Sequence, residues 1–305
     1  MKEILIYISN YFRYANKIVL ITCTLQTAVL VFFNYNNGLE GCLTERLALA
    51  WPEFTGHYIL FAVAFIMPYF SYWLIEKKNF FRNKPFTILL VVAPAIFALK
   101  TALKAELPFS VDIKWNQFWN QVYYWPALLL ITTAILLLLW KFFDRDQGFY
   151  GLSVKNFKWK PYVLMLLIMI PLIAVASTQP DFLAMYPKLR SVMPLTNDLH
   201  LSRIHKLLFE LSYGSDFFSI EIFFRGFLVL AFIKWAGKDA ILPMACFYCT
   251  IHFGKPLEEC ISSYFGGIFL GIIVFNTKSI YGGLIVHLGI AWLMELGGYI
   301  HPLSP

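Results

Sequence analysis

Long runs of apolar residues recur along the whole chain, separated by short polar segments. Each run is close to the about 20 residues that a helix needs to cross the hydrocarbon core of a bilayer. Because lipid offers no partner for an unpaired backbone group, such runs are expected to be helical. The pattern predicts an all-α, polytopic transmembrane helical bundle of about nine spans. The predicted spans are residues 17–34, 57–75, 85–103, 124–143, 161–178, 203–235, 240–253, 260–277 and 280–298.

Composition supports a membrane protein. Charged residues make up 14% of the chain, whereas soluble domains carry about 25%. The net charge of +7 comes from basic residues in short loops, and the basic patches with interleaved aromatics that bind single-stranded nucleic acid are absent from the sequence. We therefore expect the lipid bilayer, and no nucleic acid, as a partner.

The charges of the loops predict an orientation. Segments 76–84 and 141–160 are basic, and segment 34–56 is acidic. Basic loops stay on the cytoplasmic side, so we expect an integral protein of the cell membrane with a cytoplasmic N-terminus. Segment 179–202 is polar with mixed charge and fits either an external loop or a re-entrant piece.

Polar residues divide the chain into two parts. Residues 1–178 are mostly aliphatic and are expected to be N-terminal accessory transmembrane helices. Residues 203–300 carry ionisable residues and many glycines within apolar runs, and are expected to form the core domain that carries the function. Within this part, Gly267-x-x-x-Gly271 predicts a close contact between two helices.

Four ionisable residues lie inside the apolar runs of this second part. Glu221 and Arg225 share one run, and His252 and His287 lie in two others. A charge at the centre of a membrane helix costs about 2.5–3.5 kcal/mol, so such residues mark candidate functional sites. Glu221 and Arg225, four residues apart, share a helix face. They also fit a purely structural ion pair, just as each histidine alone fits a satisfied core residue.

The order and spacing of these residues resemble the motifs of a known family, the CAAX-protease and bacteriocin-processing (CPBP, or Abi) intramembrane endopeptidases. The family's first motif, Glu-Glu-x-x-x-Arg, matches Ile220–Arg225. Its second, Phe-x-x-x-His, matches Tyr248–His252, and its third, His-x-x-x-Asn or His-x-x-x-Asp, matches His287–Ala291. The resemblance covers about residues 203–298.

The resemblance implies an activity and a set of site residues. In the family, the first-motif glutamate activates water, and the histidines and the asparagine stabilise the oxyanion. Carried onto this chain, the implied catalytic residues are Glu221, Arg225, His252 and His287. The implied substrate is a membrane-associated or prenylated, CAAX-type peptide or a membrane protein, and no cofactor is implied.

Two positions depart from the family's motifs. Ile220 stands where the first glutamate is expected, and Ala291 stands where the asparagine or aspartate is expected. Asp216 lies one helical turn before Ile220, and Glu295 one turn after Ala291, so each shares a face with the altered position. We hypothesise that Asp216 or Glu221 acts as the base and that Glu295 partly replaces the missing polar group. Both residues also fit packing roles, because one turn is about 5.4 Å along the axis.

A zinc site is an alternative use of the same residues. Glu221, His252 and His287 could supply three ligands. The chain lacks His-Glu-x-x-His, however, and no two histidines have the spacing of ligands on one helix. We therefore expect no metal.

Three functions remain open from the sequence. The first is an intramembrane endopeptidase of the CPBP type. The second is a catalytically inactive relative that acts as a membrane scaffold, which the substitutions at Ile220 and Ala291 favour. The third is a transporter that uses the ionisable residues as a proton path, although no inverted repeat supports it.

Overall fold

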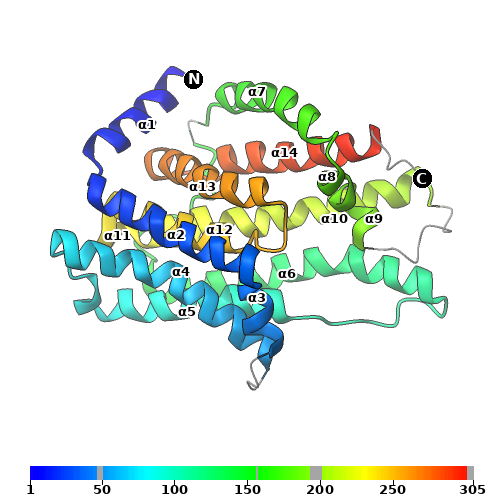
Figure 1. Cartoon of the computed structure of the whole chain (residues 1–305), viewed down its shortest axis with the longest axis horizontal. Helices are drawn as coiled ribbons and strands as arrows, with labels where there is room; N and C mark the ends of the chain where they lie inside the picture. Colours follow the sequence, from blue (N-terminus) through cyan, green and yellow to red (C-terminus); the bar gives the residue numbers. More distant parts are fainter. Residues whose placement is uncertain (47–50, 156, 193–200, 301–305) are drawn as a thin grey trace. The chain divides into compact units, whose positions relative to one another are not determined.

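The structure, a computed structural model, describes residues 1–46, 51–155, 157–192 and 201–300. Within these ranges every regular element is a helix and no strand occurs (Figure 1). Of the polar segment 179–202, residues 193–200 lie outside the described ranges. The all-α prediction is therefore confirmed for the part of the chain that the structure describes.

Six of the described helices are long and apolar enough to cross a membrane. They are α2 (Lys17–Asn37), α4 (Pro52–Glu76), α5 (Lys84–Ala102), α6 (Ile113–Phe143), α13 (Leu257–Thr277) and α14 (Tyr281–Ile300). A further apolar helix, α7 (Lys160–Ala176), is shorter. These helices mark the chain as an integral membrane protein.

The other two predicted spans are also helical but differ from simple membrane helices. The predicted span 203–235 consists of α10 (Arg203–Glu221), the π-helical segment η4 (Ile222–Ala231) and α11 (Ile233–Ala236). The predicted span 240–253 is α12 (Ile241–Thr250), whose ten residues extend about 15 Å. That is about half of the hydrocarbon thickness, so α12 alone does not cross it, and nine spans remain a prediction.

The remaining elements are short. They are α1 (Lys2–Tyr14), α3 (Leu39–Gly41), η1 (Cys42–Arg46), η2 (Phe80–Arg82), α8 (Pro180–Met185), α9 (Lys188–Val192) and η5 (Gly237–Ala240).

The chain forms two compact units that interleave along the sequence. Unit 1 comprises Met1–Lys104, Ile135–Val154 and Ile222–Ile280. Unit 2 comprises Ala105–Ala134, Lys155–Glu221 and Tyr281–Pro305. Each unit takes residues from both parts that the sequence suggested, so the division into an accessory part and a core domain stays a prediction about their roles.

Unit 1 is built around the short helix α12. In Figure 1, α2, α4 and α5 lie side by side, and α12 packs against α2, α4 and α13. Every residue of α12 is buried. Gly267 and Gly271 allow α13 to approach it, since a Cβ atom at Gly271 would lie 2.7 Å from Met244 Cε. The close helix contact predicted from the glycine spacing is confirmed.

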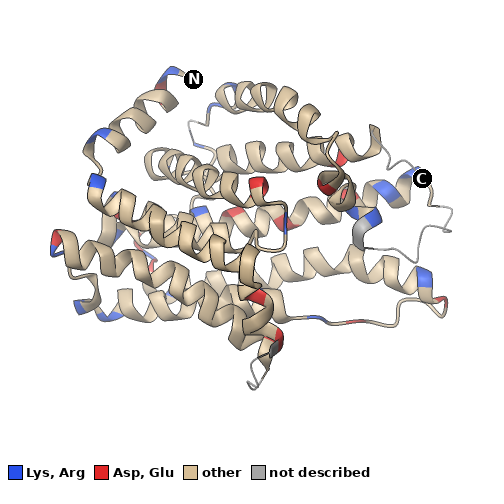
Figure 2. Cartoon of the chain, viewed as in Figure 1, with Lys and Arg blue, Asp and Glu red and all other residues tan. Residues whose placement is uncertain are grey.

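Charged residues lie near the ends of the long helices of unit 1. Figure 2 shows α2, α4 and α5 without charged residues along their middles. This distribution is that of helices whose central turns lie in hydrocarbon, because unpaired charges are costly there.

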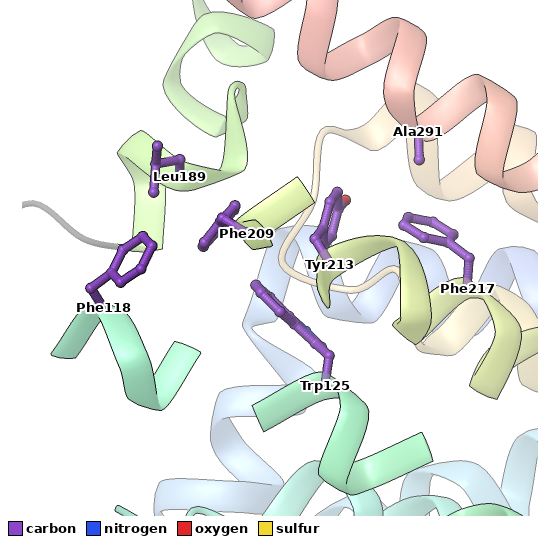
Figure 3. Packing of buried hydrophobic residues seen from close by; sticks show 7 residues of the cluster. All are labelled: Phe118, Trp125, Leu189, Phe209, Tyr213, Phe217 and Ala291. Carbon is purple, nitrogen blue, oxygen red and sulfur yellow. The ribbon is translucent and has the colours of Figure 1, made fainter. Parts of the chain in front are cut away.

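Unit 2 packs α14 against α7 and α10. Its buried core is largely aromatic (Figure 3) and consists of Phe118, Trp125, Leu189, Phe209, Tyr213, Phe217 and Ala291. Glycines on α14 allow the close approach of α7, because a Cβ atom at Gly289 would lie 2.5 Å from Leu166 Cδ1. Residues of this aromatic core lie on α10 and α14, the two helices that carry Glu221 and His287.

Candidate active site

Glu221 and His287 form a hydrogen-bonded pair within unit 2. Glu221 is the last residue of α10 and is fully buried. His287 lies on α14, and its Nδ1 atom is 3.0 Å from Glu221 Oε1. With an ionised carboxylate, Nδ1–H of His287 donates to Oε1, and such charge-assisted bonds are among the stronger ones in proteins. The pair thus fixes the direction of a buried carboxyl group.

Gly283 makes room for this carboxyl group on α14. A Cβ atom at Gly283 would lie only 2.3 Å from Glu221 Oε2 and 3.2 Å from its Cδ. Gly283 precedes His287 by four residues, so both lie on the same face of α14. Sequence analysis did not single out Gly283 as a site residue, although its spacing from His287 is the signal that could have found it.

The other side of His287 is covered by an aromatic ring. The rings of Phe217 and His287 are 4.8 Å apart at 80°, an edge-to-face arrangement. Phe217 belongs to the aromatic core, and so does Ala291, which is buried. Figure 3 shows Phe217 and Ala291 on facing helices of this core. Ala291, at the position where the resembling family has an asparagine or aspartate, is therefore part of an apolar core. The sequence analysis did not predict that Ala291 belongs to this aromatic core.

Arg225 stacks on an aromatic ring within unit 1. It lies in η4 and is fully buried. Its Cζ atom is 3.9 Å from the centre of the Tyr248 ring, a distance typical of cation–π contacts. A guanidinium group stays charged in proteins, so Tyr248 holds a permanent positive charge in place.

Tyr248 also positions His252. The Nδ1 atom of His252 is 3.1 Å from the backbone oxygen of Tyr248, and the two rings are 4.8 Å apart. Because a carbonyl oxygen only accepts, Nδ1 carries the hydrogen, and Nε2 of a neutral His252 is an acceptor. One residue thus contacts both implied catalytic side chains of unit 1. It occupies the aromatic position of the second motif, which sequence analysis matched without giving it a role.

The segment after Arg225 is packed too closely for a side chain. A Cβ atom at Gly226 would lie 2.7 Å from the backbone oxygen of Tyr150. The π-helical geometry of η4 is rare and is frequently found at functional sites. The Arg-Gly sequence is thus explained by a buried cation followed by a close backbone contact.

Asp216 and Glu295, the residues hypothesised to replace the missing polar groups, have different surroundings. Asp216 is half-buried on α10, and its role as a base stays a prediction. Both carboxylate oxygens of Glu295 accept from the backbone nitrogen of Lys188, at 2.9 Å each. Glu295 therefore anchors the start of α9, which is a structural role.

The five predicted site residues are thus divided between the units. Glu221, His287 and Asp216 belong to unit 2, and Arg225 and His252 belong to unit 1. The structure pairs Glu221 with His287 in one unit and brings Arg225 and His252 onto Tyr248 in the other. Over the described ranges, no group of three or more His, Cys, Asp or Glu side chains is placed to hold a metal ion.

Comparison with known proteins supports the resemblance read from the motifs. A family model described as type II CAAX prenyl endopeptidase Rce1-like matches residues 215–293. This region contains Asp216 and all three motifs. No curated protein and no solved structure matches the chain significantly. The recognition made from the motifs is confirmed: residues 215–293 match the Rce1-like family of CAAX prenyl endopeptidases.

Proposed function

We propose that the chain is an intramembrane endopeptidase in which the carboxylate of Glu221 activates water. The observation that carries this proposal is the fully buried Glu221 held by His287 at 3.0 Å. A positioned carboxylate within reach of water acts as a general base and contributes typically 10²–10⁴-fold to the rate. The match of residues 215–293 to a family of endopeptidases supports the same reaction.

The proposed hydrolysis uses one water molecule and leaves the protein unchanged. Glu221 takes a proton from water as the oxygen bonds to the peptide carbonyl carbon. The C–N bond then breaks, and the proton passes from Glu221 to the leaving nitrogen. The products are a carboxylic acid and an amine, and no covalent intermediate with the protein is needed.

The remaining site residues take separate roles in this proposal. Arg225, always charged, donates to the oxyanion, which is the kind of contact that contributes most in acyl transfer. His252, with its proton on Nδ1, accepts from water through Nε2. His287 orients Glu221, and Asp216 is a second candidate base. The proposal requires Glu221, Arg225, His252 and His287 to meet in one water-accessible site.

The substrate proposed from the family is a peptide. We propose a membrane-associated peptide, or a prenylated one of the CAAX type, cleaved by a protein of the cell membrane. The helices of residues 1–178 would surround the core of residues 203–300 in a bundle of about nine spans with a cytoplasmic N-terminus.

A catalytically inactive membrane scaffold is the second candidate. The buried Ala291 within the aromatic core favours it, because alanine cannot supply the polar group that the family uses at this position. Ile220 also favours an inactive scaffold, because it is buried and cannot accept a proton. An inactive relative would keep the fold and the peptide-binding surface without turnover.

Peptide hydrolysis by the purified protein in liposomes separates the two. We expect wild-type protein to cleave members of a quenched fluorescent peptide library and Glu221→Gln to lose at least about 10²-fold in kcat. Glu258→Gln, which changes an exposed carboxylate on α13, is the matched control and should behave as wild type. Equal turnover by wild type and Glu221→Gln would refute the assigned base. Binding of peptides without any turnover would establish the scaffold.

A further inference from the structure

Unit 1 has one basic and one acidic end (Figure 2). The basic end consists of the α1–α2 junction, the α4–α5 loop, α11, η5 and the end of α13. Its cations are Arg13, Lys17, Lys77, Lys78, Arg82, Lys84, Lys234, Lys238 and Lys278. The acidic end consists of the ends of α2, α4, α5 and α13 that lie away from the basic end. Its carboxylates are Glu40, Glu45, Glu53, Glu258 and Glu259.

Contacts between distant segments establish each end. At the basic end, Lys238 Nζ donates to the backbone oxygen of Tyr14 at 2.5 Å. There too, Lys78 on the α4–α5 loop pairs with Asp239 of η5 at 2.5 Å. The segment that leads into α12 therefore lies at the basic end.

The acidic end is held together in the same way. His57 at the start of α4 contacts Glu40 at 3.3 Å, and Glu53 pairs with Lys104 just after α5 at 2.7 Å. Lys255, another cation of this end, is paired with Glu259 at 2.6 Å. Two cations of this end, Lys104 and Lys255, are thus each in an ion pair with a carboxylate.

His252 lies at the acidic end. The hydroxyl group of Tyr35, near the end of α2, donates to the backbone oxygen of Lys255 at 2.6 Å. A Cβ atom at Gly254 would lie 3.9 Å from Glu40 Oε2. Because α12 starts beside Asp239 and ends just before His252, the helix runs from the basic end toward the acidic end.

Arg225 lies on the same side of the unit. The ring of its neighbour Phe224 is 5.0 Å from the ring of Phe97, and Phe97 is five residues before the end of α5 at Ala102. From there η4 leads toward Lys234 at the basic end. Both implied catalytic residues of unit 1 are therefore nearer to the acidic end.

Loops rich in lysine and arginine remain on the cytoplasmic side of a membrane. The basic end of unit 1 is thus cytoplasmic, and the end that holds His252 is on the opposite face. We propose that Arg225 and His252, the site residues of unit 1, lie toward the extracytoplasmic face and that the substrate is a peptide segment exposed on, or exported to, that face. The inference rests on the proposed function and narrows its substrate class, since it excludes a prenylated protein presented from the cytoplasm.

Cysteine labelling in intact cells tests the orientation without requiring any turnover. In a Cys42→Ser background, the other native cysteines are buried. Single variants Glu258→Cys and Lys278→Cys place exposed thiols at the acidic and basic ends. We expect a membrane-impermeant maleimide to label the first variant in intact cells and the second only after permeabilisation. The reverse pattern would overturn the proposal.

Vesicles of defined orientation test the direction of substrate entry. A membrane-impermeant quenched peptide that the purified protein cleaves is added outside right-side-out and inside-out vesicles. We expect cleavage at least about tenfold faster in right-side-out vesicles, and faster cleavage in inside-out vesicles would overturn the inference. Failure of the purified protein to cleave any peptide refutes the proposed function instead, while the labelling result still decides the orientation.

Discussion

Replacement of Gly283 by alanine tests the position of the Glu221 carboxylate. The new Cβ atom would lie 2.3 Å from Oε2, whereas ordinary contacts begin at 3.4 Å. The carboxylate must therefore move by about 1 Å, because it is the free end of a side chain and yields before the helix backbone does. A shift of this size takes the bond to His287 out of hydrogen-bonding range.

The expected loss can be estimated from this displacement. A misplacement of about 1 Å costs on the order of 10²-fold in rate, which corresponds to about 2.7 kcal/mol of transition-state stabilisation. Folding should be less affected, because loss of the buried hydrogen bond costs about 1–3 kcal/mol and the higher helix propensity of alanine offsets up to about 1 kcal/mol of this cost. We therefore expect a large fall in kcat with a moderate fall in melting temperature.

The assay compares kcat and thermal unfolding of wild type, Gly283→Ala and Gly266→Ala in liposomes. Gly266 on α13 is the matched control, because a Cβ atom there meets nothing within 4 Å. If Gly283→Ala kept wild-type turnover, Glu221 would not be the base in the position described. An equal fall in turnover for Gly283→Ala and Gly266→Ala would also contradict the reasoning.

Three further substitutions test neighbouring contacts. Tyr248→Phe keeps the ring beneath Arg225 and should retain the wild-type kcat. Tyr248→Leu removes a contact of about 0.5–2 kcal/mol and should lower kcat about 2–30-fold; equal kcat values for both variants would contradict the positioning role. Gly226→Ala should lower the free energy of unfolding by about 1–3 kcal/mol, because the new Cβ atom meets the backbone oxygen of Tyr150. Gly148→Ala, whose Cβ atom meets open space, is the control and should unfold like wild type. Glu295→Gln weakens the bonds to the nitrogen of Lys188 and should lower the melting temperature without changing kcat; a loss of kcat at unchanged stability would instead support a catalytic role for Glu295.

The sequence predicted the elements better than their arrangement. The apolar runs predicted α2, α4, α5, α13 and α14 to within a few residues, since hydrophobicity and length decide whether a segment can cross a bilayer. The two interleaved units were not predicted. They depend on contacts such as that of Leu166 with Gly289, which join segments far apart in the chain.

The candidate site was predicted as a set of residues, not as a set of contacts. The four-residue spacing of Glu221 and Arg225 suggested that they pair. The structure gives Glu221 a hydrogen bond to His287 and places Arg225 on the ring of Tyr248. These contacts cross between helices, and periodicity within one helix carries no information about them.

The proposed hydrolysis requires Glu221 and His252 to reach the same water molecule. The most direct measurement is the distance between the carboxylate of Glu221 and Nε2 of His252 in an experimental map of the full chain in lipid. The account predicts a separation of about 6 Å or less, so that one water bridges the two groups. A larger separation, with His252 directed at acyl chains, would contradict it.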